Sequence, residues 1–126
     1  MAIQKVNTSF GALLKGDSTK IIRESIRNGL DNKGVKKALR IINQACPKKE
    51  DKVYLYLRDM HKIGFTLDEY AGIRSGVKVA KDGKVLEKNI DPRGINPKYL
   101  LYKFAQTVRD LVTGKIQPDE TVKLYK

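Results

Sequence analysis

The basic residues of this chain give its clearest functional signal, and their spacing is helical. One polar stripe follows the spacing i, i+3, i+4, i+7, i+11 and consists of Lys33, Lys36, Lys37, Arg40 and Gln44. Residues at these intervals share one side of a helix. Lys48 and Lys49 extend the charge past the expected end of that helix. Such a face is suited to the phosphates of a nucleic-acid backbone, which it would contact with little sequence preference.

The charge of the chain is concentrated toward its beginning. Of the formal net charge of +12, residues 1–49 carry +8, from 11 Lys and Arg against 3 Asp and Glu. A localised positive surface attracts polyanions. We therefore predict a nucleic-acid-binding surface made of two helical stripes and the residues that follow the second one. It comprises Lys20, Arg23, Arg27, Lys33, Lys36, Lys37, Arg40, Lys48 and Lys49. The simpler alternative is a solvated, charged helix face.

Catalytic and metal-binding patterns are weak by comparison. Cys46 and His61 are the only residues of their types, whereas a structural zinc site usually needs four such ligands. The sequence has no glycine-rich phosphate loop and no nucleophile elbow. Asp82-Gly83-Lys84 matches the Asp-x-Lys element of some metal-dependent nucleases, but a tight turn explains it more simply. We expect a protein that is not an enzyme and needs no cofactor or metal, with a small nuclease as a remote alternative.

One further segment interleaves aromatic and basic residues. It is the stretch 98–103, in which Tyr102 shares a helical side with Lys98 and Arg109. Aromatic rings beside cations can stack on unpaired bases. A tyrosine at this spacing more often lies at the edge of the core with its hydroxyl in water. The segment is therefore not included in the predicted binding surface.

Hydrophobic periodicity and capping residues predict a mainly α fold of the α+β class. We expect about five short helices, at residues 19–28, 33–46 and 50–63, from Thr66 onward, and from Asn96 to Gly114. A single β-hairpin is expected near residues 77–88, where Asp82-Gly83 favours a type I′ turn. At this length residues 1–126 form one domain, with a possible flexible tail at 115–126.

The order helix, turn, short helix and hairpin is also that of winged-helix DNA-binding proteins. In this chain the candidate recognition helix would span residues 67–74. Asp68 and Glu69 would then stand at its beginning, where phosphates approach, so the sequence disfavours this arrangement.

The function expected from the sequence is binding of DNA or RNA without catalysis. The alternative is a small regulatory or inhibitory protein that binds an acidic surface of a protein or nucleoprotein machine, and small basic chains of this kind are typical of phage-encoded regulators. Residues 1–12 lack the apolar run of a signal peptide, no stretch is apolar enough to span a membrane, and the lone cysteine is typical of a reducing compartment. We therefore expect a cytoplasmic protein without a membrane partner.

Overall fold

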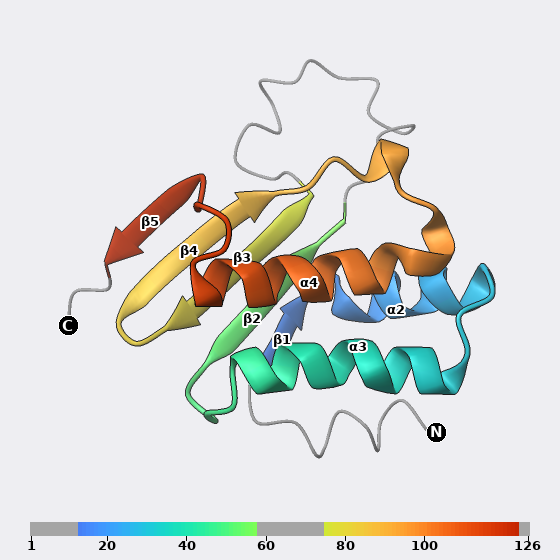
Figure 1. The fold of residues 1–126 in the computed structure, drawn as a ribbon, viewed down its shortest axis with the longest axis horizontal. Coiled ribbons are helices and arrows are strands. Elements are labelled where there is room, and N and C mark those ends of the chain that lie inside the picture. The colour runs from blue at the N-terminus through green and yellow to red at the C-terminus, as the bar shows by residue number, and fades with distance from the viewer. Residues whose placement is uncertain (1–12, 58–74, 124–126) are drawn as a thin grey trace.

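The computed structural model describes residues 13–57 and 75–123 of the chain (Figure 1). These residues form three helices, two short 3-10 turns and five strands. In chain order the elements are β1 (Leu13–Gly16), α2 (Ser18–Arg27), α3 (Asn32–Ala45), β2 (Lys52–Tyr56), β3 (Gly76–Lys81), β4 (Lys84–Asn89), η3 (Pro92–Gly94), η4 (Pro97–Tyr99), α4 (Leu100–Thr113) and β5 (Glu120–Lys123).

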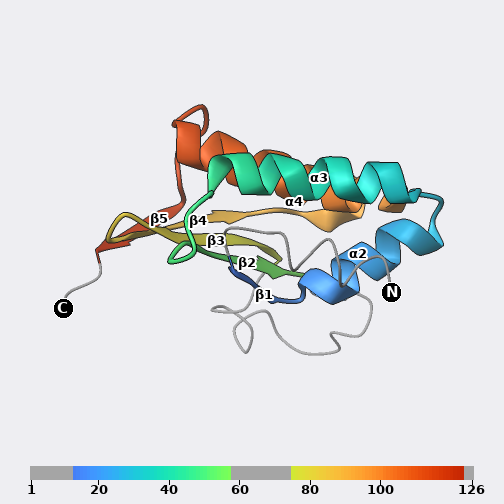
Figure 2. The same ribbon diagram turned by 90° about the horizontal axis from the view of Figure 1, so that it is seen from below.

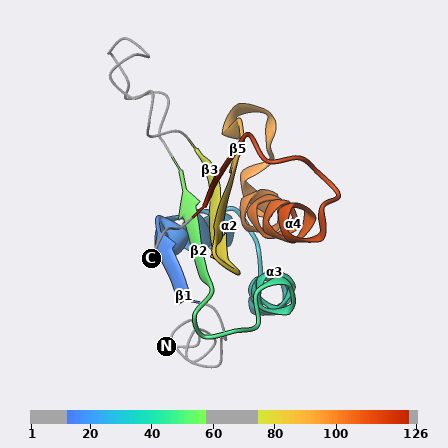
Figure 3. The ribbon, with the colours of Figure 1, turned by 90° about the vertical axis from the view of Figure 1, so that its left-hand side faces the viewer.

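The strands form one mixed sheet in the order β1-β2-β3-β4-β5. β1 pairs with β2 in parallel, after a crossover through α2 and α3, and the other neighbours are antiparallel. α3 and α4 lie side by side on one face of this sheet (Figures 2 and 3). The result is an α/β fold with a helix layer on a sheet. The predicted fold of about five helices with a single hairpin is wrong.

The clearest error concerns the helix predicted for residues 50–63. Its first part contains the interior strand β2, in which Val53 and Leu55 are buried while Lys52 lies on the other side of the sheet. This alternation has the period of a strand. The segment also contains apolar residues at helical intervals, and its acidic residues are typical of the start of a helix. These signals favour a helix even though the segment forms a strand. The remainder of this helix, His61, and the helix expected from Thr66 lie outside the described residues.

The expected hairpin is present as β3 and β4. Asp82 and Gly83 have φ angles of +53° and +76°, as a type I′ turn requires. Within the range 115–126, Glu120–Lys123 pairs with β4 as strand β5. Asp119 begins this contact by accepting a hydrogen bond from the Asn89 amide at 2.7 Å.

The three helices of the described residues occur where helical periodicity predicts them. Asp31 caps α3 by accepting a hydrogen bond from the Gly34 amide at 2.8 Å, and Gly114 ends α4 in a left-handed conformation. α2 packs against α4 and η4 at one end of the sheet (Figure 2). A buried hydrogen bond from the Leu101 amide to Ser25 Oγ at 3.0 Å joins α2 to the start of α4.

The core lies between the helix layer and the sheet. It contains the fully buried side chains of Ile21, Leu39, Ile42, Phe104 and Val108 from the helices, and Val53, Leu55 and Val79 from the sheet. Burying the apolar sides of α3 and α4 on the sheet leaves their polar sides facing outward. The basic residues of α3 are therefore presented on the outside of the helix layer.

Candidate nucleic-acid interface

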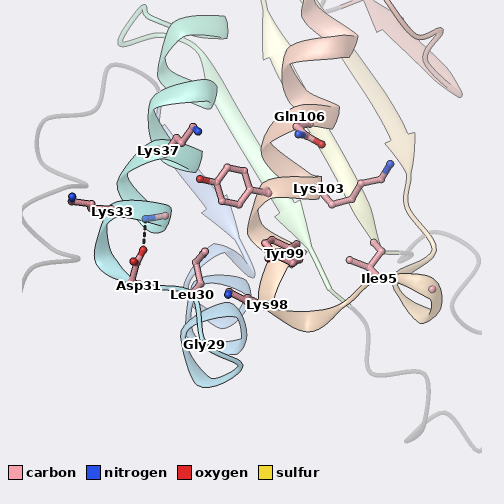
Figure 4. A pocket seen from close by; sticks show the side chains of 13 residues that line it. Gly29, Leu30, Asp31, Lys33, Lys37, Ile95, Lys98, Tyr99, Lys103 and Gln106 are labelled. Atoms are coloured by element: carbon pink, nitrogen blue, oxygen red, sulfur yellow. Dashed lines mark hydrogen bonds between the residues drawn. The ribbon is translucent and has the colours of Figure 1, made fainter.

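An open groove of about 790 Å³ runs between the first half of α3 and the beginning of α4 (Figure 4). Most of the polar side chains that line it are basic or aromatic. They are Lys33 and Lys37 from α3, Lys98 and Tyr99 from η4, and Tyr102, Lys103 and Gln106 from α4, with Asp31 as the one carboxylate. Figure 4 shows Lys33 and Lys103 reaching outward from the two helices on either side of the groove.

Local capping fixes the ends of both helices that form this groove. The start of α3 is held by Asp31, whose carboxylate is occupied by the amide of its own first turn. Glycine at position 34 in the same turn leaves room for the Leu30 side chain, which a Cβ atom there would displace. On the opposite side, Asn96 accepts a hydrogen bond from the Lys98 amide at 3.1 Å and so holds the turn that presents Lys98 and Tyr99.

The lysines give the groove a net positive charge, and the rings of Tyr99 and Tyr102 are part of its lining. Tyr99 is 48% exposed, and the Lys98 ammonium lies 5.5 Å from the centre of its ring. Burial, together with the charge of Asp31, raises the pKa of the Tyr102 hydroxyl. This hydroxyl therefore stays protonated at neutral pH and can donate a hydrogen bond. Four lysines against one carboxylate that already caps a helix make the groove suited to an anionic ligand.

The structure divides the nine predicted residues into three groups. Lys33 and Lys37 line the groove, and the exposed Lys36 and Arg40 continue from them along the same helix. These four residues form one surface, as the spacing predicted.

The basic residues of α2 do not join that surface. Their helix buries Ile21, Ile22 and Ser25, so Arg23 and Arg27 lie on its opposite side. Lys20 Nζ donates to the Leu57 carbonyl oxygen at 3.2 Å and ties α2 to the end of β2. None of the three α2 residues lines the groove.

Lys48 and Lys49 are exposed in the loop after α3, at the end of that helix far from the groove. The Lys48 ammonium lies 3.5 Å from Asp82 in the hairpin turn, so a neighbouring carboxylate partly offsets its charge. The nine residues are thus not one continuous site.

Sequence reasoning missed half of the groove. Lys98, Tyr99 and Lys103 line the groove and belong to the aromatic and basic stretch 98–103, which is not part of the predicted surface. The alternation of charge and ring was the usable signal. The other half of the groove could not be assigned to it, because nothing in the sequence places residues 98–103 beside α3.

The described residues contain no group of three or more His, Cys, Asp or Glu side chains placed to hold a metal ion. Asp82 has the positive φ of a turn residue and pairs with Lys48. No helix in the described ranges, 13–57 and 75–123, is long and apolar enough to cross a membrane.

Cys46 is fully buried, and this determines its reactivity. Burial, and next the negative charge of Asp51, raise the pKa of its thiol from 9.0 to about 11. Because the thiolate is the nucleophile, the reactive fraction at pH 8 falls about 100-fold below that of an ordinary cysteine. We expect iodoacetamide to alkylate the native protein at least about 100-fold more slowly than the urea-unfolded chain. Mass spectrometry of quenched time points measures both rates, and equal rates would contradict the burial of this thiol.

Comparison with known proteins finds no matching family model, no significantly similar curated sequence and no significantly similar solved structure.

Proposed function

We propose that this protein binds nucleic acid without catalysis, and that the groove between α3 and α4 is its phosphate-binding surface. The observation that carries the proposal is that four lysines from separate segments, Lys33 and Lys37 with Lys98 and Lys103, line one groove. The exposed ring of Tyr99 lines the same groove, with the Lys98 ammonium 5.5 Å from its centre. Lysines around a groove contact successive phosphates, and the affinity they provide depends steeply on salt.

Of the predicted residues, Lys36 and Arg40 are placed to extend this contact along α3. Both are exposed and follow directly from the lysines in the groove. Phosphates beyond the groove would meet these side chains as the backbone continues along the helix. The α2 residues, Lys48 and Lys49 lie elsewhere and are left out of the proposed contact.

The test is a double charge reversal, Lys33→Glu with Lys37→Glu. We expect it to weaken binding of labelled duplex and single-stranded oligonucleotides by at least about 10-fold, because two phosphate contacts become repulsive. Loss of two contacts should also make the slope of log K against log salt shallower by about 1.8 for duplex DNA. Fluorescence anisotropy from about 50 to 300 mM salt measures both quantities.

The matched control reverses two exposed lysines outside the groove, Lys84→Glu with Lys115→Glu. Its net charge equals that of the groove variant, so a nonspecific charge effect would weaken both proteins equally. We expect less than about a 3-fold loss for the control, since distant surface charges are screened at these salt concentrations. Equal losses in the two variants would contradict the groove. Absence of binding to any nucleic acid at low salt would contradict the function and favour an acidic protein partner.

A further inference from the structure

The face of the sheet opposite α3 and α4 carries a second group of aromatic and basic residues. Strand alternation puts Val53 and Leu55 in the core, and therefore puts the residues between them on this other face. We define the outer face by Leu13 and Lys15 of β1, Lys52, Tyr54 and Tyr56 of β2, and Lys78 of β3. Figures 2 and 3 show that α3 and α4 both lie on the other side of the sheet.

The pairing register brings these residues into contact. Lys15, Tyr54 and Lys78 are direct neighbours in one row across three strands. The Lys78 ammonium lies 6.0 Å from the centre of the Tyr54 ring and 3.0 Å from Glu87. The hydrogen bond to that carboxylate raises the pKa of Lys78. The lysine therefore remains charged at all ordinary pH values.

The two tyrosine rings are parallel. Their planes differ by 8°, and their centres are 6.2 Å apart. Tyr56 has glycine on both neighbouring strands, because its register partner in β3 is Gly76 and Gly16 lies beside its ring. Glycine has no side chain to cover the ring. The rings are half-buried and remain partly accessible from the side away from the helices.

We propose that this outer face binds unpaired bases of a single-stranded nucleic acid, with Tyr54 and Tyr56 stacking on bases and Lys15 and Lys52 contacting the adjoining phosphates. Aromatic side chains beside a basic track recognise single strands because every base offers a π-face. A duplex hides those faces within its own stack, so it gains nothing from the tyrosines. The inference rests on the proposed function, since it specifies the strand state of the ligand, but it uses a different surface.

The experiment compares a labelled oligothymidine of about 12 nucleotides with a duplex of equal length. The variant is Tyr54→Leu with Tyr56→Leu, which keeps apolar bulk on β2 and removes both rings. We expect its affinity for the single strand to fall at least about 10-fold, and its affinity for the duplex to change less than about 2-fold. Tyr54→Phe with Tyr56→Phe keeps the rings and should retain wild-type affinity.

A second measurement uses the wild-type protein and needs no variant. The chain has six tyrosines and no tryptophan, so its intrinsic fluorescence reports tyrosine alone. Stacking on Tyr54 and Tyr56 should quench part of this emission when oligothymidine is added, and the Leu pair should lose that quenching. Unchanged quenching and unchanged single-strand affinity in the Leu pair would overturn the outer-face proposal.

The outcomes separate this inference from the proposed function. If the groove reversal weakens binding and the Leu pair does not, the groove proposal is supported and the outer-face proposal is contradicted. If the Leu pair weakens single-strand binding and the groove reversal changes nothing, the outer face stands and the groove falls. If the wild-type protein binds neither oligonucleotide at low salt, both proposals fall.

Discussion

Replacing Asp51 with alanine is expected to lower the free energy of unfolding by about 3 kcal/mol. The Asp51 side chain is 3% exposed and accepts a hydrogen bond from Lys81 Nζ at 3.0 Å. It also accepts the Lys48 amide at 3.1 Å. Burial works against the charge of Lys81, but the hydrogen bond and charge of Asp51 outweigh it and raise the lysine's pKa. Removing the carboxylate leaves both donors without this acceptor in a largely dry site.

The same residue connects three parts of the fold, which is why the cost should be global. Its backbone carbonyl accepts the Leu13 amide at 3.0 Å and starts the pairing of β1 with β2. Its side chain joins the loop after α3 to β3. Loss of the carboxylate releases the loop after α3 from β3, directly beside the backbone contact that pairs β1 with β2. The effect should appear in the stability of the whole domain.

Urea unfolding followed by circular dichroism measures this cost. Arg27→Ala is the control, because Arg27 forms an exposed ion pair with Glu24 at 3.6 Å, and such pairs contribute little. We expect Arg27→Ala to stay within about 0.5 kcal/mol of the wild type. A loss below about 1 kcal/mol for Asp51→Ala would show that the pair with Lys81 contributes no more than a surface contact.

Replacing Gly16 with alanine is expected to lower the free energy of unfolding by about 2 to 4 kcal/mol. Gly16 ends β1 with a φ of +77°, which is unfavourable for any residue that has a Cβ atom. A Cβ atom there would lie 2.6 Å from the Leu55 carbonyl oxygen and 3.2 Å from the Tyr56 ring. That oxygen already accepts the Asp17 amide, so the strand cannot move away without breaking this contact.

The chain offers a control that isolates the steric part of this cost. Gly114 has a nearly identical φ of +79°, with no heavy atom within 4 Å of the corresponding Cβ position. Gly114→Ala should therefore cost only the backbone strain, about 1 kcal/mol. Chemical denaturation of both variants compares them directly. Equal losses would mean that β1 adapts freely and that contact with β2 does not restrict this position.

The sequence predicted those elements whose local signals agree. α3 has a cap, a stop and one apolar stripe, and the β3–β4 hairpin has its turn residues between alternating strands. The prediction for β2 was wrong because five residues are too few to distinguish the period of a strand from that of a helix. Acidic residues that resemble a helix cap precede this interior strand and favoured the helix. β1 is not among the predicted elements, since a four-residue parallel strand gains its stability from a partner about forty residues away.

The site followed the same pattern. The stripe of Lys33, Lys36, Lys37 and Arg40 depends on helix geometry alone, and all four residues are exposed on α3 as predicted. Whether this stripe and the α2 residues share one surface depends on the relative orientation of the two helices, which residue spacing does not encode. The convergence of α3 with Lys98 and Lys103 is likewise a tertiary property. The outer face required knowledge that Tyr54 lies in a strand.

The two outer strands of the sheet have a consequence for how the protein behaves at high concentration. Within the described residues these strands are β1 and β5, and each is four residues long. A free strand edge is a template on which a second chain can add by backbone hydrogen bonding, and short edges with lysines resist this. Lys15 lies within β1. The sheet is therefore poorly suited to edge-to-edge polymerisation, which favours a dispersed protein at the concentrations that binding titrations require.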